Sequence, residues 1–125
     1  MRVTLPKRLS LWAPPVVLMG AIFLVSAQPD LDSGLGLADT IGRKLVHFGE
    51  YALLTFLSWR ALRTRTTHRT AVLAALLIAS AYAVSDEYHQ SFVEGRAGTP
   101  IDWAIDTAGA AAIALRLQSR RKAPA

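Results

Sequence analysis

The chain has 125 residues, which is enough for one domain and too few for two of ordinary size. Its residues are 52% hydrophobic and 18% charged, against about 25% charged in an average soluble domain, and this composition argues against intrinsic disorder. Cysteine is absent, which excludes disulfide scaffolds and thiolate chemistry, and the 14 basic against 9 acidic residues point to nucleic acid or an anionic membrane surface.

The first apolar segment, residues 9–29, is a run of 21 residues without an ionisable side chain. A helix of about 20 residues crosses a hydrocarbon core about 30 Å thick, so the segment predicts a membrane-spanning helix. Pro14 and Pro15 are expected to kink this helix or to mark its start. The basic residues before it and the small residues 25–27 also fit a cleavable signal peptide, but the uncharged run exceeds a usual signal core and favours a retained anchor.

The second and third segments are apolar over most of their length. Residues 40–62 carry His47 and Glu50 near their start, and residues 70–92 open with an uncharged run of 16 residues that ends at Ser85. A helix drawn through that run has no polar face, so it is not an amphipathic surface helix. Both segments therefore predict membrane-spanning helices.

The fourth segment, residues 100–118, carries two carboxylates near its start and is otherwise rich in small residues. Ala104, Ala108 and Ala112 recur every four positions, and small residues at that spacing let helices approach closely in lipid. With this segment the sequence predicts an all-α fold, a four-helix transmembrane bundle that forms one integral membrane domain over residues 1–125.

Basic residues alternate along the chain between the two sides of the predicted membrane. Eleven of the 14 lie before the first segment, at or between the facing ends of the second and third, or at or after the end of the fourth, and only Arg43, Lys44 and Arg96 lie near the other two connections. Because short loops rich in Lys and Arg stay cytoplasmic, we predict a multi-pass protein of the cell membrane with both termini in the cytoplasm. A nucleic-acid-binding protein gathers its charge on one face, so we expect the lipid bilayer and no nucleic acid as partner.

Ionisable side chains collect at the opposite, outer ends of three predicted helices. Residues three or four apart share a helix face, as Asp102 and Asp106 do. An ionisable group within a span normally faces the bundle and finds a partner, so we predict a polar chamber that opens to the outer surface. Glu50 and Asp106 are its candidate acid–base pair. Its candidate ligand-binding residues are Lys44, His47, Asp86, Glu87, His89, Gln90, Arg96 and Asp102.

Two stretches combine several motifs, KLVHFGEYALL at 44–54 and DEYHQSFVEGRAGTPIDWAIDTAGA at 86–110. The combination of Lys-x-x-His-Phe, Asp-Glu-x-His-Gln, a Gly-Arg turn and a later Asp resembles the VanZ-like family of bacterial membrane proteins. The resemblance implies a multi-pass envelope protein, and it implies a link to the glycopeptide teicoplanin, since the family's named member is associated with reduced susceptibility to it. The chain departs from the family at Glu94, where many relatives have Pro.

Some of the candidates have structural alternatives. Thr99 and Pro100 precede Asp102 in the pattern of a helix start, so Asp102 either caps the fourth helix or belongs to the site. Arg96 lies in a glycine-containing turn that suits phosphate or carboxylate binding, but it also has Glu94 and Asp102 as internal partners.

A metal site is a weaker hypothesis. His47, Glu50 and His89 are of the right chemistry, but their spacing is not the His-Glu-x-x-His pattern of zinc hydrolases, and a hydrogen-bonded network between helices explains them equally well. His68 stands among arginines and is expected to be solvated.

Three functions are compatible with these patterns. We favour a protein that binds an amphiphilic or anionic cell-envelope molecule through the polar chamber. The first alternative is an outer-leaflet hydrolase or transferase that acts on a lipid-linked envelope intermediate, and the second is a structural polar clasp in a protein-interaction module. Conduction by a monomer is disfavoured, because the inner halves of the spans offer little more than Thr55 and Ser58. No motif identifies a cofactor, and the oligomeric state is left open.

Overall fold

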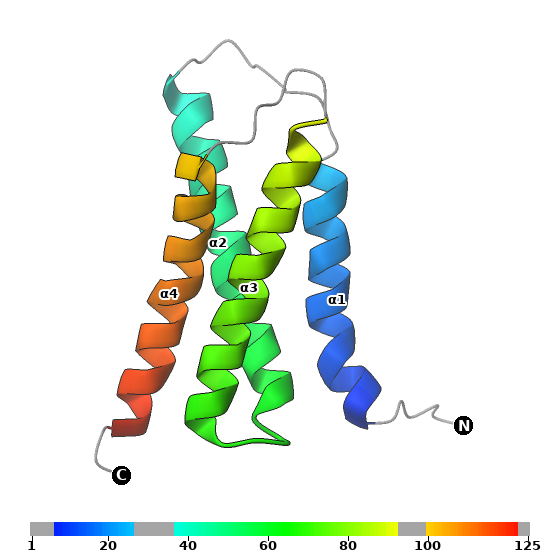
Figure 1. Ribbon diagram of the computed structural model, residues 1–125, viewed down its shortest axis with the longest axis vertical. Coiled ribbons are helices and arrows are strands. Elements are labelled where there is room, and N and C mark those ends of the chain that lie inside the picture. The colour runs from blue at the N-terminus through cyan, green and yellow to red at the C-terminus, as the bar shows by residue number, and fades with distance from the viewer. Residues whose placement is uncertain (1–6, 27–36, 93–99, 123–125) are drawn as a thin grey trace.

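A computed structural model of the chain describes residues 7–26, 37–92 and 100–122. These residues form four α-helices and include no strand, which confirms the all-α prediction. The helices are α1 (Lys7–Ser26), α2 (Leu37–Leu62), α3 (His68–Gln90) and α4 (Pro100–Lys122). They run alternately up and down (Figure 1), and the end at which α2 and α4 begin is called the upper end below.

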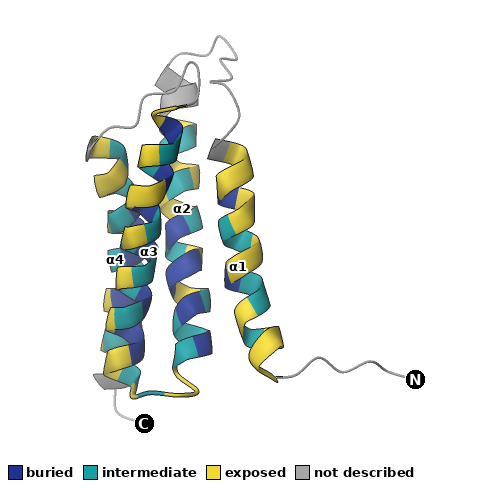
Figure 2. Cartoon of the chain, turned by 45° about the vertical axis from the view of Figure 1, so that its right-hand side comes forward, coloured by how far each residue is buried: buried dark blue, intermediate teal, exposed yellow. Residues whose placement is uncertain are grey.

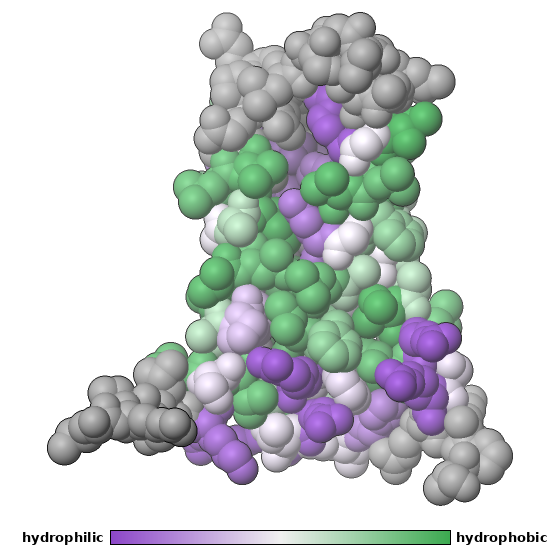
Figure 3. Space-filling view, turned by 180° about the vertical axis from the view of Figure 1, so that it is seen from behind, coloured by the Kyte–Doolittle hydropathy of each residue, from purple (hydrophilic) through white to green (hydrophobic). Residues whose placement is uncertain are grey.

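The surface of the bundle carries many exposed apolar side chains. Figure 3 shows a belt of hydrophobic side chains across one face, with hydrophilic side chains above and below it. Two helices, α1 over Lys7–Val25 and α3 over His68–Gln90, are long and apolar enough to cross a membrane. At 26 and 23 residues α2 and α4 are as long, but charged residues near both of their ends lower their hydropathy. The orientation of the bundle in the membrane stays a prediction.

Pro14 and Pro15 lie inside α1, which begins seven residues before the first of them. The expectation that they mark the start of the helix is therefore wrong. Proline is tolerated within membrane helices because neighbouring groups and local adjustments satisfy the carbonyls that lose their partner. α1 is largely exposed (Figure 2), and it packs against α2 and α3 but not against α4.

The core is built from a few large side chains of α2 and from small side chains of its neighbours. Tyr51 and Leu54 are fully buried and pack against alanines of α3 and α4, together with Ile22 of α1. α2 and α4 approach closely at Gly109, where an added Cβ would overlap the backbone carbonyl of Phe48. Small residues let these two backbones approach, which brings their polar side chains together.

The alanines that were expected to let helices approach closely do not take part in this contact. Ala104, Ala108 and Ala112 are all exposed, whereas Gly109 and Ala110 are buried. Asp106 is also buried and lies four positions before Ala110, so both share one helix face. The face of α4 that carries Asp106 is therefore the buried one, because a charged group in a membrane helix normally faces a partner inside the bundle.

Candidate functional site

Six ionisable side chains gather between α2, α3 and α4 towards the upper end of the bundle. The up-and-down order of the helices places the early part of α2 and α4 beside the last turns of α3 (Figure 1), which brings together residues far apart in the sequence. We call this group the polar cluster. Its members are Lys44, His47 and Glu50 of α2, Asp86 of α3, and Asp102 and Asp106 of α4.

His47 and Asp106 make the deepest contact in the polar cluster. The Nδ1 atom of His47 lies 3.2 Å from Oδ1 of Asp106, whose side chain is 0% exposed, against 19% for His47. The second carboxylate oxygen of Asp106 has no hydrogen-bond partner within the described part of the chain. When Nδ1 donates to the carboxylate, the tautomer and the orientation of the ring are set and Nε2 is left able to accept a proton.

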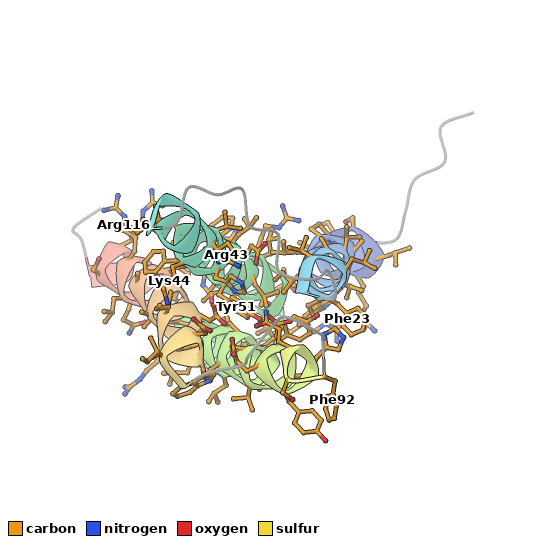
Figure 4. The ribbon with its side chains drawn as sticks, turned by 90° about the horizontal axis from the view of Figure 1, so that it is seen from above. Phe23, Arg43, Lys44, Tyr51, Phe92 and Arg116 are labelled. Atoms are coloured by element: carbon orange, nitrogen blue, oxygen red, sulfur yellow. The ribbon has the colours of Figure 1, made fainter. Side chains whose placement is uncertain are left out.

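Lys44 and Asp102 form an ion pair one helical turn closer to the upper end. Nζ of Lys44 donates to Oδ1 of Asp102 over 3.3 Å, and the two side chains are 40% and 32% exposed. Seen from above in Figure 4, Lys44 lies between α2 and α4. Asp102 thus has an internal cationic partner, while Arg96 and Glu94 lie outside the described residues.

Asp86 reaches the polar cluster from α3. Its side chain is 3% exposed, and neither carboxylate oxygen has a hydrogen-bond partner among the described residues. The hydroxyl of Tyr51, which lies near the middle of the bundle in Figure 4, is beside this carboxylate but is also without a well-formed hydrogen bond. One oxygen of Asp86, one of Asp106 and a ring nitrogen of His47 all lie within 4.8 Å of one another.

Comparison with known protein families agrees with the motifs. The sequence model of the VanZ/LLP1 family matches residues 8–118. The chain belongs to this family. No curated protein and no solved structure matches it. The match runs from α1 to α4 and includes the whole polar cluster, so the resemblance found in the sequence is confirmed, and family membership together with the apolar helices indicates a membrane protein.

The remaining candidates of this VanZ/LLP1 protein lie around the end of α3. His89 stacks on Phe23 of α1, with ring centroids 4.2 Å apart and an interplanar angle of 18°. Gln90 is 4% exposed, and Glu87 is half-buried. Glu50 is half-buried one turn along α2 from His47 and interacts electrostatically with His47 and both buried aspartates, but the side chain that contacts Asp106 is His47.

The structure adds one residue to the site and corrects the interpretation of another. Tyr51 is fully buried beside Asp86, and its position four residues after His47, on the same helix face, is the sequence signal by which it could have been found. His68 is not simply solvated, because its Nε2 lies 3.0 Å from the carbonyl oxygen of Leu117 and its ring makes a T-shaped contact with Trp59. The start of α3 lies beside the end of α4, which no local pattern around His68 reveals.

Proposed function

We propose that this VanZ/LLP1 protein binds an amphiphilic cell-envelope molecule from the outer leaflet, with its anionic head group at the polar cluster. The one-sided placement of the ionisable groups carries the proposal. Among the described residues of the lower half of the bundle, the fully buried polar side chains are Thr55 and Ser58, and neither is ionisable. A protein with this arrangement has a polar site at one membrane surface and no charged route through the bilayer. The arrangement therefore favours binding over conduction.

Lys44 is the proposed contact for the head group. Its side chain is 40% exposed at the upper edge of the polar cluster, and an ammonium group makes charge-assisted hydrogen bonds with phosphate or carboxylate. Tyr88, Phe92 and Ile101 are 69%, 72% and 67% exposed near the same end, and they offer apolar surface to a lipid tail. Arg96, which lies outside the described residues, is the second proposed cationic contact.

The experiment titrates the purified chain in detergent into a fluorescently labelled polyprenyl monophosphate and follows fluorescence anisotropy. Lys44→Gln is expected to weaken binding about tenfold or more, because a hydrogen bond to a charged group contributes about 1.5–3 kcal/mol. Arg63→Gln is the matched control, since Arg63 lies over Trp59 at the lower end, 4.9 Å from the ring centroid. Equal weakening in both variants, or a parent chain that does not bind, would contradict the proposal.

A hydrolase or transferase is the second candidate function, and the buried Asp106 that orients His47 favours it. The same samples distinguish the two, because a phosphatase would release inorganic phosphate from the probe. With an enzyme, Glu50→Gln and Asp106→Asn are expected to retain the probe and to lose phosphate release. Loss of both variants from the membrane would instead favour a structural clasp.

The proposal extends to teicoplanin tolerance, which the family resemblance implies. A host that expresses the parent chain is expected to tolerate more teicoplanin than a host with Lys44→Gln. Arg63→Gln should behave as the parent, and the minimum inhibitory concentration of each strain is the measurement.

A further inference from the structure

We propose that His47, Asp86 and Asp106 form a binding site for a divalent metal ion that accepts both imidazole nitrogen and carboxylate oxygen, such as Zn²⁺ or Mn²⁺. The inference rests on the proposed function, because the ion would bring positive charge to a site where carboxylates otherwise repel an anionic head group.

The three side chains are close enough together to hold a metal ion. They come from three different helices, and their ligand atoms all lie within 4.8 Å of one another. Nδ1 of His47 and Oδ1 of Asp106 are 3.2 Å apart. Two ligands at about 2.0–2.1 Å from a tetrahedral ion lie about 3.3 Å apart, so an ion could replace the hydrogen bond between these two atoms without changing their separation.

Asp86 provides an independent observation. Its carboxylate is 3% exposed, and within the described residues neither oxygen has a hydrogen-bond partner. Oδ2 of Asp106 is buried without such a partner as well. Buried polar atoms in proteins are nearly always paired, and even with the neighbouring Tyr51 hydroxyl paired to one oxygen of Asp86, the other oxygen and Oδ2 of Asp106 lack a partner among the described residues. A metal ion held between the two carboxylates would give Asp86 a partner, and it would do the same for Oδ2 of Asp106 where that carboxylate binds the ion through both oxygens.

The charges around the site also favour a metal cation. Glu50, Asp86 and Asp106 are close enough to interact with one another, and His47 is the basic group that faces them. Removing several carboxylates from water without compensating charge is costly, and a divalent ion supplies that charge. The Tyr51 hydroxyl beside Asp86 is placed to support this ligand from outside, as groups around metal ligands commonly do.

The test uses the full chain in detergent, stripped of metal with a chelator and titrated with Co²⁺ alone. We expect one equivalent of Co²⁺ to produce visible d–d absorption, and Zn²⁺ to displace it. Asp86→Asn and Asp106→Asn should bind more than about 100-fold more weakly, because even groups outside the first coordination shell change metal affinity 10–100-fold. Ser58→Ala is the control, since it also removes a fully buried polar group, but towards the lower end of α2, and should leave Co²⁺ affinity unchanged.

Two results would overturn the inference, a parent chain that binds no Co²⁺ and an Asp86→Asn variant that binds it as the parent does. Should an asparagine variant fail to fold, as judged by circular dichroism, His47→Gln and the spectrum of the parent decide instead, because loss of the imidazole changes the Co²⁺ absorption only if it is a ligand. No amphiphile is present, so failure here with intact binding of the polyprenyl probe refutes the metal site alone. Metal binding without probe binding refutes the proposed function alone.

Discussion

At the scale of single residues, the polar cluster depends on charges that are paired across helices. Asp106 is 0% exposed and is held against His47 of another helix, while the more exposed Asp102 pairs with Lys44. An exposed pair contributes at most about 1 kcal/mol, whereas a buried carboxylate without its partner is strongly unfavourable. The two pairs therefore differ in role, with the inner one stabilising the contact between α2 and α4 and the outer one available to a ligand.

The inner pair leads to a stability prediction. In metal-free buffer, His47→Leu leaves Asp106 buried without a basic partner and is expected to lower the free energy of unfolding by about 3–5 kcal/mol. Replacing both residues with leucine removes the unpaired charge and should cost much less. Reversible unfolding in mixed micelles, followed by circular dichroism, measures the free energy of unfolding of the parent, the two single variants and the double variant. Losses that simply add up in the double variant would show that the two side chains do not stabilise each other.

At the scale of helices, α2 and α3 each pack against the other three, and α2 makes the more extensive contact with both α1 and α4. Its large side chains meet small ones on α3 and α4, and the backbone carbonyl of Phe48 occupies the space in which Gly109 lacks a side chain. This close approach positions Lys44 opposite Asp102 and His47 opposite Asp106. The polar contacts thus rest on the packing of small residues.

Substitution of two glycines tests that relation. Gly109→Ala forces α4 away from Phe48 and is expected to lower the free energy of unfolding by about 1–3 kcal/mol, as overpacking does. Gly49→Ala is the matched control, because nothing lies within 4 Å of its added Cβ. Alanine there should be neutral or stabilising by up to about 1 kcal/mol, since it is the better helix former. The midpoints of thermal unfolding in detergent compare the two variants, and equal shifts would refute the close contact.

At the scale of the whole molecule, an apolar belt separates two polar ends that differ in kind. Acidic and basic side chains meet inside the upper end, whereas basic residues dominate the lower end, where α3 and the preceding connection hold Arg63, Arg65 and Arg69. Cytoplasmic loops carry such an excess of positive charge. The lower end is therefore predicted to face the cytoplasm, with the polar cluster towards the outer surface.

Reporter fusions test this orientation. A reporter that is active only in the cytoplasm is expected to be active when fused after Arg65 and inactive when fused after Gly95, because these positions lie in connections at opposite ends of the bundle. A second reporter that is active only outside the cytoplasm should give the opposite pattern. Activity of the cytoplasmic reporter after Gly95 alone would invert the bundle and move the proposed ligand to the inner leaflet.

The number and approximate bounds of the helices follow from the sequence by itself, because the hydropathy of a segment is a local property. The segment expected at 40–62 is helical as Leu37–Leu62, and α3 begins at His68, two residues earlier than expected, with Thr67 as its N-cap. The motifs were likewise enough to recognise the family. The sequence also predicts that the ionisable residues gather at one end of the bundle. Helices that alternate in direction place the start of α2 and α4 and the end of α3 at the same end.

Which side chains meet was decided by the tertiary structure. The rotation of α4 about its axis depends on how Gly109 fits against Phe48 and on the burial of Asp106, and both are contacts with another helix. The spacing of residues within α4 carries no information about contacts with another helix. For this reason Ala104, Ala108 and Ala112 indicated a face of α4 that is exposed in the structure. For the same reason the partner of Asp106 could be named as His47 only once the helices were packed together.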